Sequence, residues 1–140
     1  GGYEIGVITG YGKQAEYLSA EIENFNFKNL SLTKNLTVAT VDSFQGSEKD
    51  IIIYDIVRSG KSEDDTGLGF LEMPNRINVA LTRVTRLLVV VGDAEYVLNV
   101  NPSFRWLNAH PNEPLLLKEF VSHLHESGFI YDNPNDIFYG

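Results

Sequence analysis

Four short apolar runs, separated by longer amphipathic or polar segments, form the main pattern of this chain. The runs lie at residues 4–9, 36–41, 50–57 and 87–93. Apolar runs without regular polar alternation are typical of strands buried on both faces of a parallel sheet. The segments 13–25 and 114–127 instead repeat apolar residues at helical spacing. Strands that alternate with helices predict a wound α/β fold, with a mainly parallel sheet flanked by helices.

The segment 73–83, between the third and fourth strands, is predicted to be a helix that carries two aligned arginines. Pro74 suits the first helical turn, where its missing N–H costs nothing. The apolar face is formed by Met73, Ile77, Ala80, Leu81 and Val84. Arg76 and Arg83 are about two turns apart, so both guanidinium groups leave the same side. Either they bind phosphate, or one or both form surface ion pairs.

Polar residues that follow the first three strands should gather at one edge of the sheet. Ligands of wound sheets bind at the carboxyl ends of the strands. Thr9 ends the first predicted strand, and the turn 42–48 and Arg58 each follow a predicted strand, so we expect them to share that edge. The turn offers small hydroxyls and a glycine to an anion, and Glu48 has acceptors for two neighbouring sugar hydroxyls. An ordinary turn with Glu48 in solvent is the alternative.

Composition limits the classes of protein that fit this pattern. The 140 residues carry a net charge of -8, which argues against a domain-wide basic surface but allows a local basic groove. The chain has no cysteine, which excludes disulfides and thiolate metal sites, and its three histidines lack other candidate ligands nearby. No apolar run approaches the roughly 20 residues of a membrane span. We therefore predict a single domain over 1–140 with no metal site and no membrane partner.

A Gly-Lys pair after the first strand invites comparison with a phosphate-binding P-loop. That motif requires glycine five residues before Gly12, where this chain has Val7, and Ser or Thr after the lysine, where it has Gln14. Because both requirements fail, the chain lacks its own P-loop.

Three blocks of sequence carry a family resemblance in the expected order. They are Ile8-Thr9-Gly10-Tyr11 with Gln14, then Thr40 to Asp50 (TVDSFQGSEKD), then Gly69-Phe70-Leu71 with Asn75 to Arg83 (NRINVALTR). These blocks resemble motifs IV, V and VI of superfamily 1 helicases, most closely the 5′-to-3′ branch that includes the nonsense-mediated-decay helicase. The resemblance covers residues 3–93. The chain departs from the family pattern in having Gly10 for the usual proline and Val84 for the usual alanine, but neither change removes a side chain with a role in the chemistry.

The resemblance implies that the chain is the second, C-terminal RecA-like lobe of such a helicase, cut from a longer protein. The missing first lobe would bind most of the ATP and the Mg²⁺. Arg83 matches the arginine finger that reaches the γ-phosphate, and Glu48 matches the acid that holds the ribose. Gln45 and Gly46 fall in the segment that links the nucleotide cleft to the nucleic-acid track.

The same resemblance supplies candidates for the nucleic-acid track. Its members would be Thr9, Tyr11, Thr40, Asp42 and Ser43, with Arg58 as a further contact at a strand end. Tyr11 is equally compatible with a packing role, and Asp42 would contact a phosphate through its backbone N–H.

The intact protein is thereby expected to be an intracellular ATP-dependent helicase. Its partners would be single-stranded DNA or RNA and the N-terminal RecA-like lobe of the same chain, while the isolated chain should be inactive. The alternative is a non-catalytic helicase-like lobe that serves as a protein-interaction module. No role is assigned to residues 94–140, whose tail 129–140 either packs on the domain or meets a missing neighbour.

Overall fold

The computed structural model describes residues 2–28, 35–44, 46–56, 78, 81–101, 104–109, 112 and 115–132. These residues belong to two compact units. The first unit comprises Gly1–Ser59 and Met73–Asp93, and the second comprises Gly60–Glu72 and Ala94–Gly140. The first unit contains the sheet and all candidate site residues that the structure describes.

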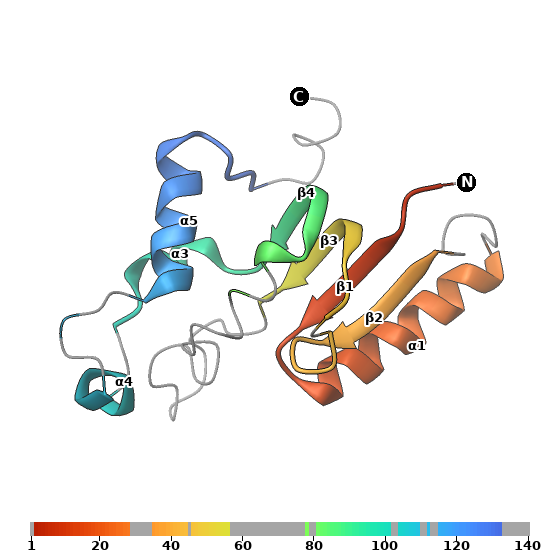
Figure 1. Cartoon of the computed structure of the whole chain (residues 1–140), viewed down its shortest axis with the longest axis horizontal. Coiled ribbons are helices and arrows are strands. Elements are labelled where there is room, and N and C mark those ends of the chain that lie inside the picture. Colours follow the sequence, from red (N-terminus) through yellow and green to blue (C-terminus); the bar gives the residue numbers. More distant parts are fainter. Residues whose placement is uncertain are drawn as a thin grey trace. The chain divides into compact units, whose positions relative to one another are not determined.

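A parallel four-stranded sheet forms the first unit, with strand order β2-β1-β3-β4 (Figure 1). The strands are β1 (Ile5–Thr9), β2 (Leu36–Thr40), β3 (Lys49–Asp55) and β4 (Val84–Val91). The helix α1 (Gly12–Lys28) follows β1 and packs against β1 and β2. A parallel sheet with a helical crossover confirms the predicted RecA-like α/β fold.

The core of this unit lies in its central strands. Register pairs Ile8 of β1 with Tyr54 of β3, and both side chains are fully buried, as is Ile52. Residues paired across parallel strands face the same side of the sheet, so these three share one apolar face. The predicted bounds of β1, β2 and β3 are confirmed to within two residues.

Strand β4 differs from its prediction in where it begins and how far it is buried. It starts at Val84, which was assigned to the apolar face of the preceding helix, because β-branched Val84 and Thr85 favour an extended backbone. Burial on both faces was also expected, yet Leu87 is 52% exposed and Val91 is 51% exposed. In the described part of the sheet β4 is an edge strand, paired only with β3, which accounts for this exposure.

The second unit contains α3 (Ala94–Asn99), α4 (Phe104–Ala109) and α5 (Leu116–Glu126). Within it α3 packs against α5, and Leu117 and Val121 of α5 are buried. The predicted stop at Gly128 is confirmed: its φ is 76°, and Phe129 N–H donates to the Leu124 carbonyl across 2.9 Å. Among the described residues, no helix is long and apolar enough to span a membrane.

Tyr54 provides a test of the buried face. Its hydroxyl is buried without a hydrogen-bond partner in the described part of the chain, and burial raises the pKa of this phenol well above its usual range. Removal of an unsatisfied hydroxyl should not destabilise a protein. We therefore expect Tyr54→Phe to leave the free energy of unfolding unchanged, or to raise it by up to about 1 kcal/mol, in urea unfolding.

The matched control is Tyr17→Phe on α1, where the tyrosine is 60% exposed and the free energy should change by no more than about 0.5 kcal/mol. A clear loss of stability in Tyr54→Phe alone would mean that the Tyr54 hydroxyl is bonded in solution.

Candidate functional site

The segment 41–48 joins opposite edges of the sheet. It leaves the carboxyl end of β2 and reaches the amino end of β3, passing β1, which lies between these strands. Phe44 anchors it: its N–H donates to the Thr40 carbonyl across 3.0 Å, and its side chain is 3% exposed. The ring packs on Gly6 of β1, where an added Cβ would lie 3.2 Å from Phe44 Cε2. Glycine at position 6 thus lets this segment cross β1 closely.

The prediction that the whole 42–48 turn lies at the carboxyl edge was wrong. Thr9, Thr40 and the residues directly after β2 do lie there, but Glu48 immediately precedes β3 and so lies at the amino edge. The physical reason is that β3 runs parallel to β2, so the chain must return along the sheet before β3 can begin. The candidate residues are therefore divided between two edges.

At the carboxyl edge, hydroxyl groups and backbone amides lie close together. Ser43 and Thr40 bond reciprocally: their hydroxyl oxygens are 2.8 Å apart, and Ser43 N–H donates to Thr40 Oγ1 across 3.2 Å. Val41 N–H donates to the Thr9 carbonyl across 3.0 Å, which joins the ends of β2 and β1. Thr9 is fully buried, and its Oγ1 has no hydrogen-bond partner in the described part of the chain. The structure thus brings Thr9, Thr40 and Ser43 together.

Two further candidates flank this cluster. Asp42 is exposed beside Ser43, and Tyr11 is partly exposed directly before α1. The first turn of α1 is fixed to β3, because Gln14 Nε2 donates to Asp55 Oδ2 across 2.8 Å. Gln14 was singled out from the sequence as part of a motif, but its hydrogen-bond partner Asp55 was not predicted, because the two residues are 41 positions apart.

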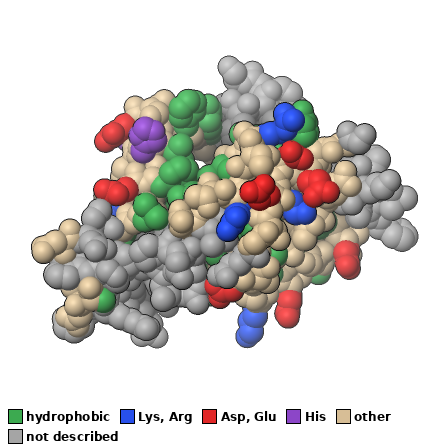
Figure 2. Space-filling model, viewed as in Figure 1, with side chains coloured by type: hydrophobic (Ala, Val, Ile, Leu, Met, Phe, Trp, Pro, Cys, Tyr) green, Lys and Arg blue, Asp and Glu red, His purple; other side chains and the backbone are tan. Residues whose placement is uncertain are grey.

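Charge at the surface is mixed. On the face shown in Figure 2, the Lys and Arg side chains of the described residues lie singly among Asp and Glu side chains, without a continuous basic patch. In many complexes, hydroxyl groups and backbone N–H groups donate hydrogen bonds to nucleic-acid phosphates, in addition to the contacts that Lys and Arg make. At the carboxyl edge, the hydroxyl groups of Thr40 and Ser43 have that chemistry, while the N–H groups of Thr40, Val41 and Ser43 are bonded within the cluster.

The amino edge brings Glu48 and Arg83 to the starts of neighbouring strands. Glu48 is exposed and directly precedes β3, while Arg83 directly precedes β4. The two segments are bonded, since Lys49 N–H donates to the Arg83 carbonyl across 3.1 Å. A carboxylate and a guanidinium group therefore leave the same edge of the sheet from adjacent strands.

Arg83 follows the end of a helical segment. Residues 78, 81 and 82 are helical, and Thr82 Oγ1 donates to the Asn78 carbonyl across 2.6 Å. Arg83 itself lies in the bend between this segment and β4, and its side chain is partly exposed. Its Nε is buried and has no hydrogen-bond partner within the described residues. The described residues thus provide no carboxylate bonded to this nitrogen, and the terminal nitrogens of the guanidinium group are the donors that could meet a phosphate.

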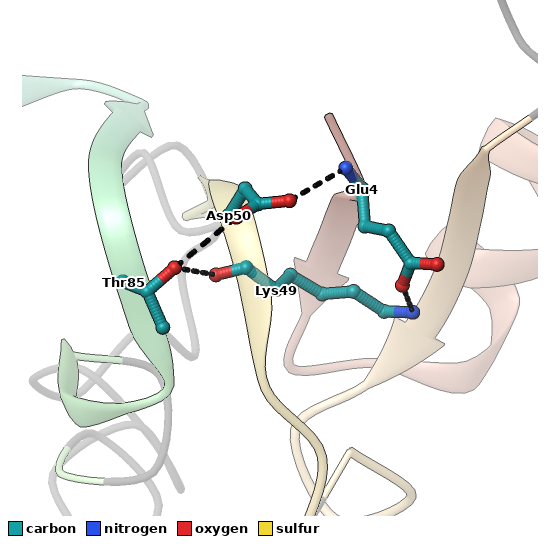
Figure 3. Close-up of polar contacts among 4 residues, drawn as sticks. All are labelled: Glu4, Lys49, Asp50 and Thr85. Carbon is teal, nitrogen blue, oxygen red and sulfur yellow. Dashed lines mark hydrogen bonds and ion pairs between the residues drawn. The ribbon is translucent and has the colours of Figure 1, made fainter. Parts of the chain in front are cut away.

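A polar network fixes the amino ends of β1, β3 and β4 beside these two residues (Figure 3). Asp50 Oδ2 accepts the Glu4 N–H across 2.9 Å, and Thr85 Oγ1 lies 3.4 Å from Asp50 Oδ1. Lys49 Nζ lies 3.0 Å from Glu4 Oε2 in an ion pair. Arg86 Nε lies 3.4 Å from Asp50 Oδ1, and its guanidinium carbon lies 5.1 Å from the Tyr3 ring centroid. The network spans three strands.

This network lowers the pKa of Asp50 below its usual value. The largest cause is the hydrogen bond from the Glu4 N–H, which favours the ionised carboxylate. Desolvation acts in the opposite direction, and the positive charge of Arg86 lowers the pKa further. Asp50 is therefore ionised throughout the neutral pH range.

Several predictions fall outside the described residues. These are the roles of Gln45, Arg58 and Arg76 and most of the arginine helix. Gly46 is described: it has a φ of 82°, a left-handed conformation that favours glycine, in the turn before Glu48. Within the described part of the chain, no group of three or more His, Cys, Asp or Glu side chains is placed to hold a metal ion.

Comparison with known proteins then identifies the family. Residues 2–95 match the family described as AAA domain, a match that includes all four strands and α1. The chain belongs to this AAA domain family.

Relatives of this AAA domain include named helicases. Regulator of nonsense transcripts 1 from Dictyostelium discoideum is 40% identical over 136 residues, which is 96% of this chain and 10% of that protein. ATP-dependent helicase upf1 from Schizosaccharomyces pombe is 36% identical over 129 residues, 92% of this chain and 12% of that protein. DNA polymerase alpha-associated DNA helicase A from Saccharomyces cerevisiae is 45% identical over 91 residues, 65% of this chain and 12% of that protein.

The chain thus spans about a tenth of the length of these curated relatives. Together with the fold, the matches confirm that this AAA domain is a C-terminal domain of the superfamily 1 helicase type.

Proposed function

We propose that this AAA domain is the C-terminal motor lobe of an ATP-dependent helicase that acts on single-stranded DNA or RNA inside the cell. The relatives named as helicases support the reaction class, and the two edges of the sheet support a division into a nucleotide side and a nucleic-acid side. The N-terminal RecA-like lobe of the same protein would complete the ATP site. The chain of residues 1–140 alone should therefore not hydrolyse ATP.

The single observation that carries this proposal is the position of Glu48 and Arg83 on adjacent strand starts, with Arg83 Nε unpartnered in the described residues. These two groups suit two ends of one nucleotide. The Glu48 carboxylate would accept hydrogen bonds from the ribose hydroxyls, and Arg83 would donate to the γ-phosphate. ATP and Mg²⁺ would be held mainly by the first lobe, where the metal supplies charge neutralisation for phosphoryl transfer.

Arg83 would act chiefly when charge develops during hydrolysis. A guanidinium group stays protonated and presents several donors in a fixed plane, so it stabilises the equatorial oxygens of a phosphoryl group in transfer. Because Arg83 sits on a lobe other than the one that holds the phosphates, hydrolysis would depend on closure of the two lobes.

The carboxyl edge would carry the nucleic-acid track. Thr40 and Ser43 would offer hydroxyl groups there, and Thr9, whose side chain is fully buried, would act through its backbone at the end of β1. Tyr11, Asp42 and Arg58 complete the proposed contacts. Such contacts to phosphate and sugar fix the strand without reading its sequence. The segment 41–48 would couple the two sites, since it connects the hydroxyl cluster after β2 with Glu48 before β3, through Gln45 and Gly46.

The ribose contact gives the sharpest test of this assignment. In the full-length protein, we expect Glu48→Ala to raise the KM for ATP about 10- to 100-fold, because hydrogen bonds to a charged group contribute about 1.5–3 kcal/mol. The wild-type protein should show a similar rise when ATP is replaced by 2′,3′-dideoxy-ATP. The variant should no longer distinguish the two nucleotides in steady-state ATPase assays.

Glu48→Gln serves as the matched control, because glutamine keeps an acceptor and the side-chain length but loses the charge. Its KM for ATP should lie between those of the wild type and Glu48→Ala. If Glu48→Ala still discriminates ATP from the dideoxy analogue as the wild type does, Glu48 does not hold the ribose. An intact protein without nucleic-acid-stimulated ATPase activity would instead support the non-catalytic interaction module.

A further inference from the structure

The pairing of β3 with β4 is irregular next to Arg83. Lys49 pairs with Val84, but Ile51 pairs with Leu87, so β3 advances by two residues while β4 advances by three. Two residues of β4, Thr85 and Arg86, therefore oppose Asp50 alone. This is a β-bulge, which adds a residue to one strand, increases the local twist and redirects the neighbouring side chains.

The Asp50 carboxylate faces both residues of the bulge. Its Oδ1 lies 3.4 Å from Thr85 Oγ1 and 3.4 Å from Arg86 Nε. Its Oδ2 is held from the other side by the Glu4 N–H at 2.9 Å (Figure 3). A backbone bond beside Asp50 adds to this link, because the Ile51 N–H donates to the Glu4 carbonyl across 3.1 Å. One side chain thus ties the bulge of β4 to the lead-in of β1.

The bulge begins two residues after Arg83. The Arg83 carbonyl is fixed to β3 by the Lys49 N–H, and the bulge sets how the following backbone turns. A strand whose register slips by one residue turns its side chains to the opposite face. The direction of Arg83 is therefore sensitive to the bulge, although neither Thr85 nor Asp50 needs to touch the nucleotide.

We propose that Asp50 is a positioning residue for Arg83: its carboxylate holds the Thr85–Arg86 bulge, and the bulge fixes the direction in which the Arg83 side chain leaves the start of β4. This inference rests on the proposed function, in which Arg83 contacts the γ-phosphate. Asp50 itself makes no contact with substrate in this scheme.

The test is Asp50→Asn in the full-length protein. Asparagine has one acceptor oxygen and one donor amide. With its oxygen on the Glu4 N–H, its amide can still meet the Thr85 hydroxyl, but it faces Arg86 with a donor, so the contact that holds Arg86 in the bulge is lost. We expect kcat for ATP hydrolysis to fall about 10- to 100-fold, as a misplacement of a catalytic group by about 1 Å does. The KM for ATP should change by less than about threefold, because Arg83 acts on the transition state.

Glu4→Gln is the matched control. It removes one negative charge at the same edge and breaks the ion pair with Lys49, but it retains the backbone N–H that Asp50 accepts. We expect its kcat to remain within about twofold of wild type, because the Glu4 carboxylate is 59% exposed and an ion pair with a solvated partner contributes little. An equal loss in Glu4→Gln and Asp50→Asn would overturn the proposal.

A double-mutant cycle separates positioning from general damage to the fold. If Asp50 acts through Arg83, Asp50→Asn should lower kcat no further in the Arg83→Ala background. An additive loss would overturn the inference while leaving the role of Arg83 intact, whereas normal turnover in Arg83→Ala alone would overturn the proposed function. If the Asp50→Asn protein does not fold, Thr85→Val serves as a second variant, because valine keeps the strand propensity and removes the hydroxyl group. We expect a smaller loss of kcat that again depends on Arg83. An unchanged kcat in Thr85→Val would overturn the inference.

Discussion

Replacement of Arg83 by alanine in the full-length protein should lower kcat for nucleic-acid-stimulated ATP hydrolysis by about 10³-fold or more. This is the largest effect that the structure leads us to expect. An arginine that meets the transferring phosphoryl group stabilises charge that is fully developed only in the transition state. The affinity for ATP should therefore change little, as measured by equilibrium binding of a fluorescent ATP analogue.

Arg83→Lys is the informative companion, because it retains the positive charge but loses the planar fork of donors. We expect its kcat to lie between those of the wild type and Arg83→Ala. Near-normal turnover in Arg83→Ala, with folding unchanged, would contradict the assignment. A loss of ATP affinity with kcat unchanged would place Arg83 in ground-state binding instead.

The second large effect concerns stability at the other end of β4. A Cβ at Gly92 would lie 2.8 Å from Ile56 Cβ and 3.1 Å from the Ile56 carbonyl oxygen. Ile56 is buried, and its N–H is bonded to the Val91 carbonyl at 2.8 Å, so the backbone cannot withdraw freely. We expect Gly92→Ala to lower the free energy of unfolding by about 2–3 kcal/mol, as overpacking does, in urea denaturation.

Gly12→Ala is the matched control, because nothing lies within 4 Å of a Cβ added at this first residue of α1. It should raise the free energy of unfolding by about 0.4–1 kcal/mol, since alanine restricts the unfolded chain. Effects of the same sign and size at both positions would show that the contact with Ile56 does not control the result.

Strands β1, β2 and β3 and helices α1 and α5 were predictable because each carries a local signal. Apolar runs marked β1, β2 and β3, and a glycine in a left-handed conformation ends α5 where the sequence placed the stop. Val84 was misassigned because one apolar residue at helical spacing is also the first residue of a strand. The exposure of Leu87 and Val91 was not predicted. It follows from the position of β4 at the edge of the sheet, and the order of strands depends on contacts between distant segments that no local pattern shows.

The candidate site was predictable in its residues but not in its geometry. Sequence blocks singled out Glu48 and Arg83. The predicted strand ends, however, placed Glu48 at the wrong edge, because a pattern shows where a strand ends and not where the chain runs next. The bulge opposite Asp50 has no local signal at all. It depends on the register between two strands whose facing residues Asp50 and Thr85 lie 35 positions apart in the sequence, and only coordinates reveal it.

A structure of the full-length protein with ADP, Mg²⁺ and aluminium fluoride, which mimics the transferring phosphoryl group, tests the roles of Arg83 and Glu48 together. We expect Arg83 donors about 3 Å from the fluoride ligands, and the Glu48 carboxylate within hydrogen-bond distance of the ribose hydroxyls. An Arg83 side chain bound to a carboxylate of its own lobe, with the mimic enclosed by other residues, would contradict the proposed function.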